Sequence, residues 1–321
     1  MKTLVTGGAG FIGSHLCERL VLDGHLVTAI DNFSTGRASN LANLAGSDNF
    51  TLVEGSILDS SILNPLIQDA DYVFHLAAAV GVFNIVKNPL ASLLTNIRGT
   101  ENVLEAAHKT KTPVFLTSSS EVYGKNISDS LKESDDRILG SPVTLRWSYS
   151  EAKAIDESLA YAYFVEKQLE ARIVRFFNTV GPRQLGAYGM VVPRFVKAAL
   201  ANEPITIYGD GNQTRCFAHV YDVVDAVIAI AFAENTIGKV INIGNDFEIS
   251  INDLAKKIIN ETGSKSEIVY IPYAEAYGDG FEDMERRVPN IELINQLVGW
   301  APKRDLSTMI ADISADIKKG S

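Results

Sequence analysis

Tyr149 and Lys153 have the residue types and the spacing of an acid–base pair. They are four residues apart and so lie on one face of a helix predicted over Ser148–Lys167. A free tyrosine titrates near pH 10 and needs help to act as a base. A nearby ammonium group would favour the phenolate. Tyr149 could then take a proton from a hydroxyl while hydride leaves the same carbon, although the same spacing is common on solvated helix faces.

A second polar cluster follows a strand predicted at Val114–Thr117. Ser119 could donate a hydrogen bond to the reacting oxygen and share its proton with Tyr149. Glu121 is a further candidate for proton transfer. The cluster would lie at the carboxyl edge of a sheet, where doubly wound folds place their ligands. The alternative is a serine-rich turn without a chemical role.

Three glycines, Gly7, Gly10 and Gly13, follow the strand predicted at Lys2–Thr6 and open the helix predicted at Phe11–Leu22. The first permits a tight turn, the second lets the backbone approach a pyrophosphate, and the third lets the helix pack closely on the strand. The free N–H groups at the start of the helix would then bind phosphates. This context predicts a dinucleotide site.

The second predicted strand, Leu26–Ile30, is followed by Asp31. An acidic side chain at this place can bind the adenosine ribose hydroxyls and repels a 2′-phosphate, which favours NAD over NADP. Asn32, Thr35 and Gly36 could complete the adenosine pocket. The alternative role of Asp31 is to cap a loop.

Strands alternate with helices through the first half of the chain, which predicts an α/β fold with a doubly wound parallel sheet of the Rossmann type. We assign residues 1–178, with about 219–245, to this domain. Residues 179–218 and 246–321 would form a smaller α/β C-terminal lobe that binds the substrate. The other predicted elements are strands at 51–53, Tyr72–His75, Arg172–Arg175, Lys239–Ile243 and near Glu267–Ile271, and helices at Ala91–Lys109 and Val220–Ala233.

The formal net charge of −10 and the sequence pI of about 5.1 disfavour nucleic acid and anionic membranes as partners. No apolar run approaches the roughly 20 residues that span a bilayer, and the N-terminus does not read as a signal peptide. We therefore expect a cytoplasmic protein. Cys17 and Cys216 are expected to remain unbridged, and no metal site is expected.

Several segments together resemble the extended short-chain dehydrogenase/reductase family, the NAD-dependent epimerases, dehydratases and decarboxylases of nucleotide sugars. Besides the glycines and the Tyr149/Lys153 pair, the resemblance rests on His75-Leu76-Ala77-Ala78, Asn96, residues 117–124, Arg175-Phe176-Phe177-Asn178 and residues 204–217. It implies a bound NAD that is reduced and reoxidised within one turnover. It also implies a homodimer in which two long helices of each subunit form a four-helix bundle.

The resemblance also implies roles for residues that spacing alone does not single out. Lys153 would hold the nicotinamide ribose, and Arg215 would pair with the diphosphate of a UDP-sugar. Ser56 stands where the family often has aspartate, which implies altered adenine contacts. The remaining cofactor-binding candidates are Phe11, Ile12, Ile57, Leu76, Ala77, Ala78, Asn96 and Thr117, and the remaining substrate-binding candidates are Asn178, Val192, Thr206 and Tyr208.

The kind of reaction depends on residues 119–121 and on Arg287. The order Ser119-Ser120-Glu121 is closest to the Thr-Ser-Glu of UDP-glucuronate decarboxylases and lacks the acid used by the family's dehydratases. The segment Tyr277–Asp283, followed by Arg286-Arg287-Val288-Pro289-Asn290, is similar to the C-terminal segment of uronate decarboxylases. In that family, the arginine two residues before the proline faces the sugar carboxylate.

Oxidation at C4 of a glucuronate makes a β-keto acid, which loses carbon dioxide readily. We therefore expect UDP-glucuronate decarboxylation through a transient 4-keto sugar. The alternative is 4-epimerisation of a UDP-hexose or UDP-hexuronate. A remote alternative is a non-catalytic NAD-binding sensor, but such proteins usually lose the tyrosine or the lysine that this chain keeps.

Overall fold

The computed structural model describes residues 1–81, 87–186, 190–272, 275, 284 and 286–319. The segment Tyr277–Asp283, which carries part of the resemblance to uronate decarboxylases, lies outside the described residues. Arg286 and Arg287 lie within them.

A seven-stranded sheet forms the centre of the first domain, with the strand order β11-β6-β5-β4-β1-β2-β3. All its neighbouring strands pair in parallel. The order reverses between β1 and β4, which confirms the predicted doubly wound sheet and places its ligand crevice at their carboxyl ends. The strands are β1 (Lys2–Thr6), β2 (Leu26–Asp31), β3 (Phe50–Glu54), β4 (Tyr72–His75), β5 (Val114–Ser119), β6 (Ala171–Phe176) and β11 (Val240–Ile243).

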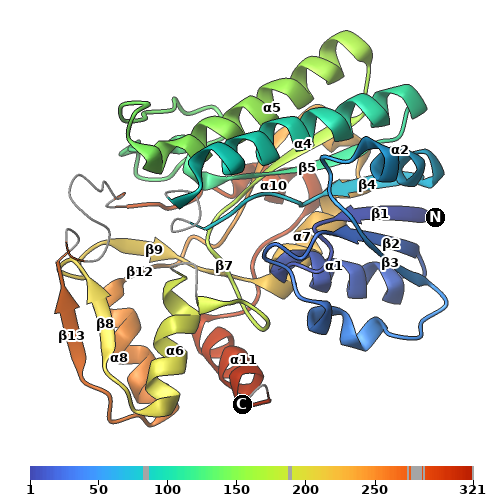
Figure 1. The fold of residues 1–321 in the computed structure, drawn as a ribbon. Coiled ribbons are helices and arrows are strands. Elements are labelled where there is room, and N and C mark those ends of the chain that lie inside the picture. Colours follow the sequence, from blue (N-terminus) through green and yellow to red (C-terminus); the bar gives the residue numbers. More distant parts are fainter. Residues whose placement is uncertain (82–86, 187–189, 273–274, 276–283, 285, 320–321) are drawn as a thin grey trace.

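Helices cover both faces of this sheet (Figure 1). One face carries α2 (Ser60–Asp69), α4 (Pro89–Thr110) and α5 (Ser148–Lys167), and the other carries α1 (Phe11–Leu22), α7 (Val220–Ala231) and α10 (Glu292–Val298). Successive strand residues point to opposite faces. In β1, Leu4 therefore joins the core beneath α4, whereas Val5 joins the core beneath α1. At the centre of the sheet, all four residues of β4 are buried, as expected for a strand covered on both faces.

Within the residues that the structure describes, the second lobe is built from three short strand pairs and three helices. Its core packs apolar residues of α6, β8, α8 and α11 together, among them Phe195, Ile207, Leu254 and Ile310. The elements are β7 (Thr179–Val180) paired with β10 (Ala218–His219), β8 (Ile205–Tyr208) with β13 (Ile268–Ile271), β9 (Thr214–Cys216) with β12 (Glu248–Ser250), and the helices α6 (Val191–Ala201), α8 (Ile251–Thr262) and α11 (Leu306–Lys319). Short 3-10 helices are η1 (Ala38–Leu44), η2 (Ser120–Tyr123), η3 (Leu145–Trp147) and η5 (Glu234–Thr236).

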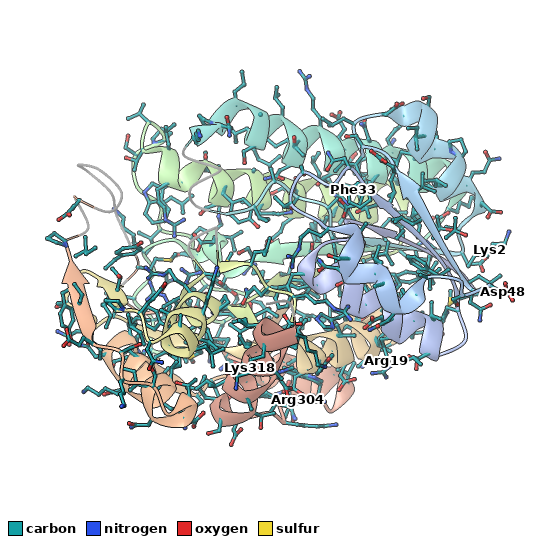
Figure 2. All side chains as sticks on the ribbon, turned by 60° about the horizontal axis from the view of Figure 1, so that its bottom comes forward. Lys2, Arg19, Phe33, Asp48, Arg304 and Lys318 are labelled. Carbon is teal, nitrogen blue, oxygen red and sulfur yellow. The ribbon has the colours of Figure 1, made fainter. Side chains whose placement is uncertain are left out.

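The predicted division of the chain does not follow the packing at residues 291–300. Ile294 and Trp300 join the core formed by α7 and β11, because this stretch is apolar enough to cover that face of the sheet. The next residues then bind α7. The Asp222 carboxylate accepts hydrogen bonds from the backbone N–H groups of Lys303 and Arg304, at 3.0 and 2.9 Å, and from the Arg304 guanidinium. Arg304, labelled in Figure 2, thus marks a fixed junction between the lobes.

The predicted elements occur in the structure, and their ends differ from the predicted ends by at most two residues. The helix predicted at Ala91–Lys109 extends over Pro89–Thr110, since proline is well suited to a first helical turn. The helix predicted to end at Ala233 ends at Ala231. Within the described part of the chain, no helix is long and apolar enough to cross a membrane, and no cluster of three or more His, Cys, Asp or Glu side chains could hold a metal ion. Cys17 and Cys216 are free, buried thiols.

A buried ion pair fixes α5 against the end of β6. Arg175 forms a two-pronged contact with Glu157, with Nε–Oε1 and Nη2–Oε2 distances of 2.9 and 2.7 Å. The guanidinium also lies over the Tyr123 ring, 4.7 Å from its centre. Since Tyr149 and Lys153 are on the same helix, this pair fixes the helix that carries the candidate catalytic residues.

Substitution of Glu157 by alanine should destabilise the protein by about 3–5 kcal/mol, because it leaves a buried guanidinium without its counter-charge. Urea unfolding of the purified variant measures this change. The matched control is Glu170→Ala, because Glu170 is exposed and lies 3.9 Å from Arg172; it should change stability by less than about 1 kcal/mol. Equal losses in the two variants would contradict the assignment.

Candidate active site

A cavity of about 690 Å³ lies at the carboxyl ends of the parallel strands and extends into the second lobe. Its volume is in the range of small-molecule and cofactor sites. Most of the predicted site residues line it, from the glycine turn at one end to Arg215 and Arg287 at the other. Gly36, Asn96 and Thr206 are not among the lining residues.

The glycine turn between β1 and α1 has no room for side chains. Gly7 has φ +71°, and a Cβ there would lie 2.8 Å from the backbone nitrogen of Ala77. A Cβ on Gly13 would lie 2.2 Å from the Gly7 carbonyl oxygen. Helix α1 begins after Gly10, and among the described residues no side chain caps it. Its first N–H groups and partial positive charge are therefore available to phosphates, as a dinucleotide requires.

Asp31 lies at the end of β2 beside this turn and is 8% exposed. Its carboxylate accepts hydrogen bonds from the backbone N–H groups of Ala9 and Phe33, at 2.9 and 2.8 Å. Burial raises the pKa of Asp31, and these two hydrogen bonds oppose that rise. Gly36 packs against the carboxylate, where a Cβ would lie 2.8 Å from Oδ2. Gly36 thus shapes the adenosine end without lining the cavity.

The rest of the adenosine end lines the cavity as predicted. The lining residues there are Asn32, Thr35, Ser56 and Ile57. The Ser56 hydroxyl accepts a hydrogen bond from the backbone N–H of Leu58, at 3.2 Å, and so fixes its own loop.

Asn96 positions the loop after β4. Its Oδ1 accepts from the Ala79 backbone N–H at 2.7 Å, and its Nδ2 donates to the Ala79 carbonyl at 3.2 Å. The Asn96 side chain is 1% exposed and holds this backbone, and its predicted contact with the cofactor stays a prediction. Leu76, Ala77 and Ala78 of the same loop do line the cavity.

Tyr149, Ser119 and Lys153 come together at the middle of the cavity. Tyr149 forms a side-chain hydrogen bond with Ser119, whose Oγ also accepts from the Glu121 backbone N–H at 3.3 Å. The Lys153 ammonium donates to the Thr117 carbonyl at 3.0 Å and to Asp156 Oδ2 at 3.1 Å. This places the predicted acid–base pair and its serine partner in one site.

The pKa of Tyr149 is raised, whereas the sequence predicts that a nearby lysine lowers it. Burial raises it, the carboxylates of Glu121 and Asp156 raise it further, and the Ser119 hydrogen bond lowers it. In the protein alone, Lys153 therefore does not bring Tyr149 into the neutral range, since its ammonium is paired with Asp156. A positive charge placed next to the phenol by a ligand would lower the pKa.

Glu121 lies between two arginines. Its Oε2 is 2.5 Å from Arg146 Nη1, and its Oε1 is 2.8 Å from Arg287 Nη1, which also donates to Ser120 Oγ at 3.2 Å. Burial alone would raise the pKa of Glu121, but the two guanidinium groups lower it to about 2. The charges of these three side chains sum to one positive charge at neutral pH, and guanidinium groups suit an anionic part of a ligand.

In the second lobe, Tyr208, Val192, Asn178 and Arg215 line the cavity as predicted. The Asn178 Nδ2 donates to the Cys216 carbonyl at 3.0 Å, which joins the two lobes at the cavity. Thr206 shares a strand face with Tyr208 but lies two residues further from the cavity. Its predicted contact with the substrate stays a prediction.

Sequence reasoning gave no role to Arg146 and Arg194. Arg194 lies over the Tyr208 ring, 4.2 Å from its centre, and lines the same end of the cavity. Arg146 stands three residues before Tyr149, a spacing that places both near the start of α5. That proximity was the available signal for Arg146, whereas nothing local identifies Arg194.

Substitution of Asp31 by asparagine should lower the affinity for NAD about tenfold and reduce the preference for NAD over NADP. The reason is the loss of a charged hydrogen-bond acceptor that also repels a 2′-phosphate. Isothermal titration with both nucleotides measures this. Asp48→Asn is the control, because Asp48 is exposed at the edge of the molecule (Figure 2). An unchanged NAD/NADP ratio in Asp31→Asn would remove Asp31 from the ribose site.

Comparison with known proteins agrees with this site. The model of the NAD dependent epimerase/dehydratase family matches residues 3–244. The UDP-N-acetyl-alpha-D-glucosaminuronate decarboxylase of Bacillus cytotoxicus is 43% identical over 302 residues, which are 94% of this chain and 92% of that protein. UDP-glucuronic acid decarboxylase 1 of Xenopus tropicalis is 37% identical over 303 residues, which are 94% of this chain and 68% of that protein.

A similar solved structure is the UDP-glucuronic acid 4-epimerase of Bacillus cereus in complex with UDP-glucuronic acid and NAD. It has a TM-score of 0.90 and 31% sequence identity, and the match covers 100% of both chains. On the family match and these relatives, the chain belongs to the NAD dependent epimerase/dehydratase family.

Proposed function

We propose that this protein decarboxylates a UDP-sugar uronate, with UDP-glucuronate as the reference substrate, through a transient 4-keto sugar. The observation that carries the proposal is Glu121 held between Arg146 and Arg287 in the cavity that contains Tyr149. An arginine fork matches a carboxylate, and the C5 carboxylate is what separates uronates from hexoses. The two decarboxylase relatives support this choice.

The charge of the cavity fits a nucleotide sugar, although the chain as a whole carries a formal charge of −10. The Arg215 guanidinium, 8% exposed, would pair with the diphosphate, and Tyr208 with Arg194 above it would hold the base. The described lining contains the cationic residues Arg146, Lys153, Arg194, Arg215 and Arg287 and the acidic residues Asp31 and Glu121.

The glycine turn, Asp31 and the loop after β4 would hold NAD, with Lys153 at its nicotinamide ribose. When bound, NAD supplies the acceptor for hydride at C4 and the donor for a later reduction. Tyr149 removes the proton of the C4 hydroxyl, and Ser119, which is hydrogen-bonded to Tyr149, orients the same oxygen. The product is a ketone β to the carboxylate. The C5–C6 bond then breaks, its electron pair moves toward the ketone oxygen, and carbon dioxide leaves.

Glu121 would supply the proton that C5 then needs. While both arginines hold it, its pKa of about 2 keeps it ionised and unable to donate. A substrate carboxylate bound to Arg287 would draw away one of the two positive charges and add a negative one, and both changes raise the pKa of Glu121, which then takes up a proton from water. After carbon dioxide has left, Arg287 can pair with Glu121 again, which favours release of the proton to C5.

A second candidate is 4-epimerisation of a UDP-hexuronate. The supporting observation is the Bacillus cereus structure, whose enzyme is an epimerase with UDP-glucuronic acid bound. Both reactions begin with oxidation at C4. They differ in whether the carboxylate is held while the ketone forms, and so in the role of Arg287 and Glu121. The presence of Tyr149 and Lys153 argues against a non-catalytic sensor.

The homodimer belongs to the same proposal. Helices α4 and α5 pack side by side on one face of the sheet (Figure 1). Ile155, Tyr161 and Val165 of α5 are 40%, 51% and 59% exposed, an apolar surface that a second copy of the helix pair would cover in a four-helix bundle.

Purified protein with NAD should convert UDP-glucuronate into a UDP-pentose and carbon dioxide. Proton NMR of parallel samples with UDP-glucuronate, UDP-N-acetylglucosaminuronate, UDP-glucose and UDP-galactose measures the conversion, and Tyr149→Phe provides the blank. Growth of a pentose anomeric signal supports the proposal, and the two uronates compared show which substituent at C2 is preferred. Inversion at C4 with the carboxylate retained would establish the epimerase instead.

Arg287→Gln should lower kcat/KM for the uronate by about a hundredfold, since loss of one partner of a buried charge pair between protein and ligand costs roughly 2–5 kcal/mol of binding. UDP binding, measured by titration, should change little. Arg286→Gln is the matched control, because Arg286 is 41% exposed in its side chain and pairs with Glu248 at 2.8 Å. Equal weakening of UDP and uronate binding by Arg287→Gln would make Arg287 a phosphate ligand.

A further inference from the structure

Helix α5 carries a third polar residue on the face of the catalytic pair. Tyr149, Lys153 and Asp156 occupy positions i, i+4 and i+7, which lie in one stripe along a helix. Asp156 is 0% exposed, and its Oδ2 accepts a hydrogen bond from Lys153 Nζ at 3.1 Å. A fully buried carboxylate is rare unless it is paired, and here its partner is the candidate catalytic lysine.

A buried polar chain beside this pair reaches the cofactor end. The Thr100 hydroxyl of α4 hydrogen-bonds with His75 Nε2, at 3.1 Å. His75 Nδ1 is 2.8 Å from Thr6 Oγ1, which accepts from the Ala77 backbone N–H at 3.1 Å. Burial lowers the pKa of His75 to about 3, so the imidazole is neutral. Among the described residues, Asp156 is therefore the carboxylate that pairs with the Lys153 ammonium.

The other charged groups that face the stripe are already paired. Glu121 lies between Arg146 and Arg287, and Glu157 is bound by Arg175. On balance the pKa of Asp156 is raised above its ordinary value, because burial raises it and Glu157 adds to the rise, while Lys153 and Thr100 oppose it. The Lys153 ammonium at 3.1 Å favours the ionised carboxylate.

We propose that Asp156 is a positioning residue that holds Lys153 and balances its charge, so that Lys153 alone does not convert Tyr149 into a base. The role rests on the proposed function of Tyr149 and Lys153. Tyr149 then stays protonated in the free protein and ionises when the positive charge of an oxidised nicotinamide enters the cavity. The consequence is that deprotonation of the sugar hydroxyl is confined to the state in which hydride can also be accepted.

Asp156→Asn tests this, because asparagine keeps the shape and one hydrogen-bond acceptor but removes the negative charge. The uncompensated Lys153 should then lower the pKa of Tyr149 by about 1–3 units. Two readouts follow it: the acid limb of kcat/KM against pH, which should move to lower pH by the same amount, and the ultraviolet titration of tyrosinate in cofactor-free protein. Subtraction of the corresponding Tyr149→Phe protein isolates the signal of Tyr149.

Glu166→Gln is the matched control, because it removes a carboxylate from an exposed position on the same helix. It should leave both readouts unchanged. A folded Asp156→Asn protein with the wild-type titration and pH profile would overturn the inference, since Asp156 would then be protonated or its charge would not reach Tyr149. A merely structural role would lower stability or kcat without moving either pH midpoint, and that result also overturns the inference.

The wild-type protein tests the inference without any change at Asp156, should Asp156→Asn not fold. Cofactor-free Tyr149 should remain protonated at about pH 10, where an ordinary tyrosine is half ionised, and should titrate lower with NAD bound. Ionisation well below pH 10 in the free protein would overturn the inference. Lack of turnover of any UDP-sugar would contradict the proposed function instead. The tyrosinate titration would still decide the role of Asp156.

Discussion

Charge compensation at the carboxyl edge of the sheet is the constraint on which the rest of the site depends. An ion removed from water without a partner is costly, so each ionised group placed there has to meet an opposite charge inside the protein. Three such groupings lie along α5 and its neighbours: Glu157 with Arg175, Lys153 with Asp156, and Glu121 with Arg146 and Arg287. The pair of Glu157 and Arg175 does not border the cavity, and it holds α5 in place. The other two border the cavity and can change partners when a charged ligand enters.

The two groupings that border the cavity act on different parts of the ligand. The pair of Lys153 and Asp156 is balanced, so that the state of Tyr149 depends on the charge brought by a ligand on the cofactor side. The group around Glu121 has one positive charge in excess, so that it favours a ligand anion on the sugar side. Both respond through the same physical effect, a change in the pKa of a buried acid caused by a charge a few ångströms away. The fold supplies this by bringing η2, η3 and the stretch before α10 to one end of α5.

The second lobe contributes position more than chemistry. Its core is separate from the two cores of the sheet, but Asp222 and residues 300–304 fasten it to α7 at the side away from the cavity. Arg215 and Tyr208 are consequently held opposite the glycine turn at a fixed separation, and the space between them is the cavity. A negatively charged protein surface can thus coexist with a locally positive site, because the arginines are concentrated at that one junction.

The sequence by itself determined the parts of this protein that depend on local rules. The strand–turn–helix at Gly7–Gly13, the acidic end of β2 and the stripe of Tyr149 and Lys153 follow from turn geometry and helix period, which few residues specify. The alternation of strands and helices likewise determined the doubly wound sheet. Where the packing departs from the sequence reading, a local rule was extended too far: residues 291–300 were assigned by their position along the chain, but Ile294 and Trp300 join the core of the first domain.

Only the tertiary structure decided which charges meet. Glu121 and Arg287 are 166 positions apart, and no period relates them. The direction of the Tyr149 pKa was also beyond the sequence, because it depends on burial and on the carboxylates of Glu121 and Asp156, and Glu121 reaches Tyr149 from another part of the chain. On α5, the apolar residue Ala152 is buried in the protein, whereas the apolar residue Ile155 is exposed. Spacing gives a residue its face on a helix, but the packing of distant elements decides what that face meets.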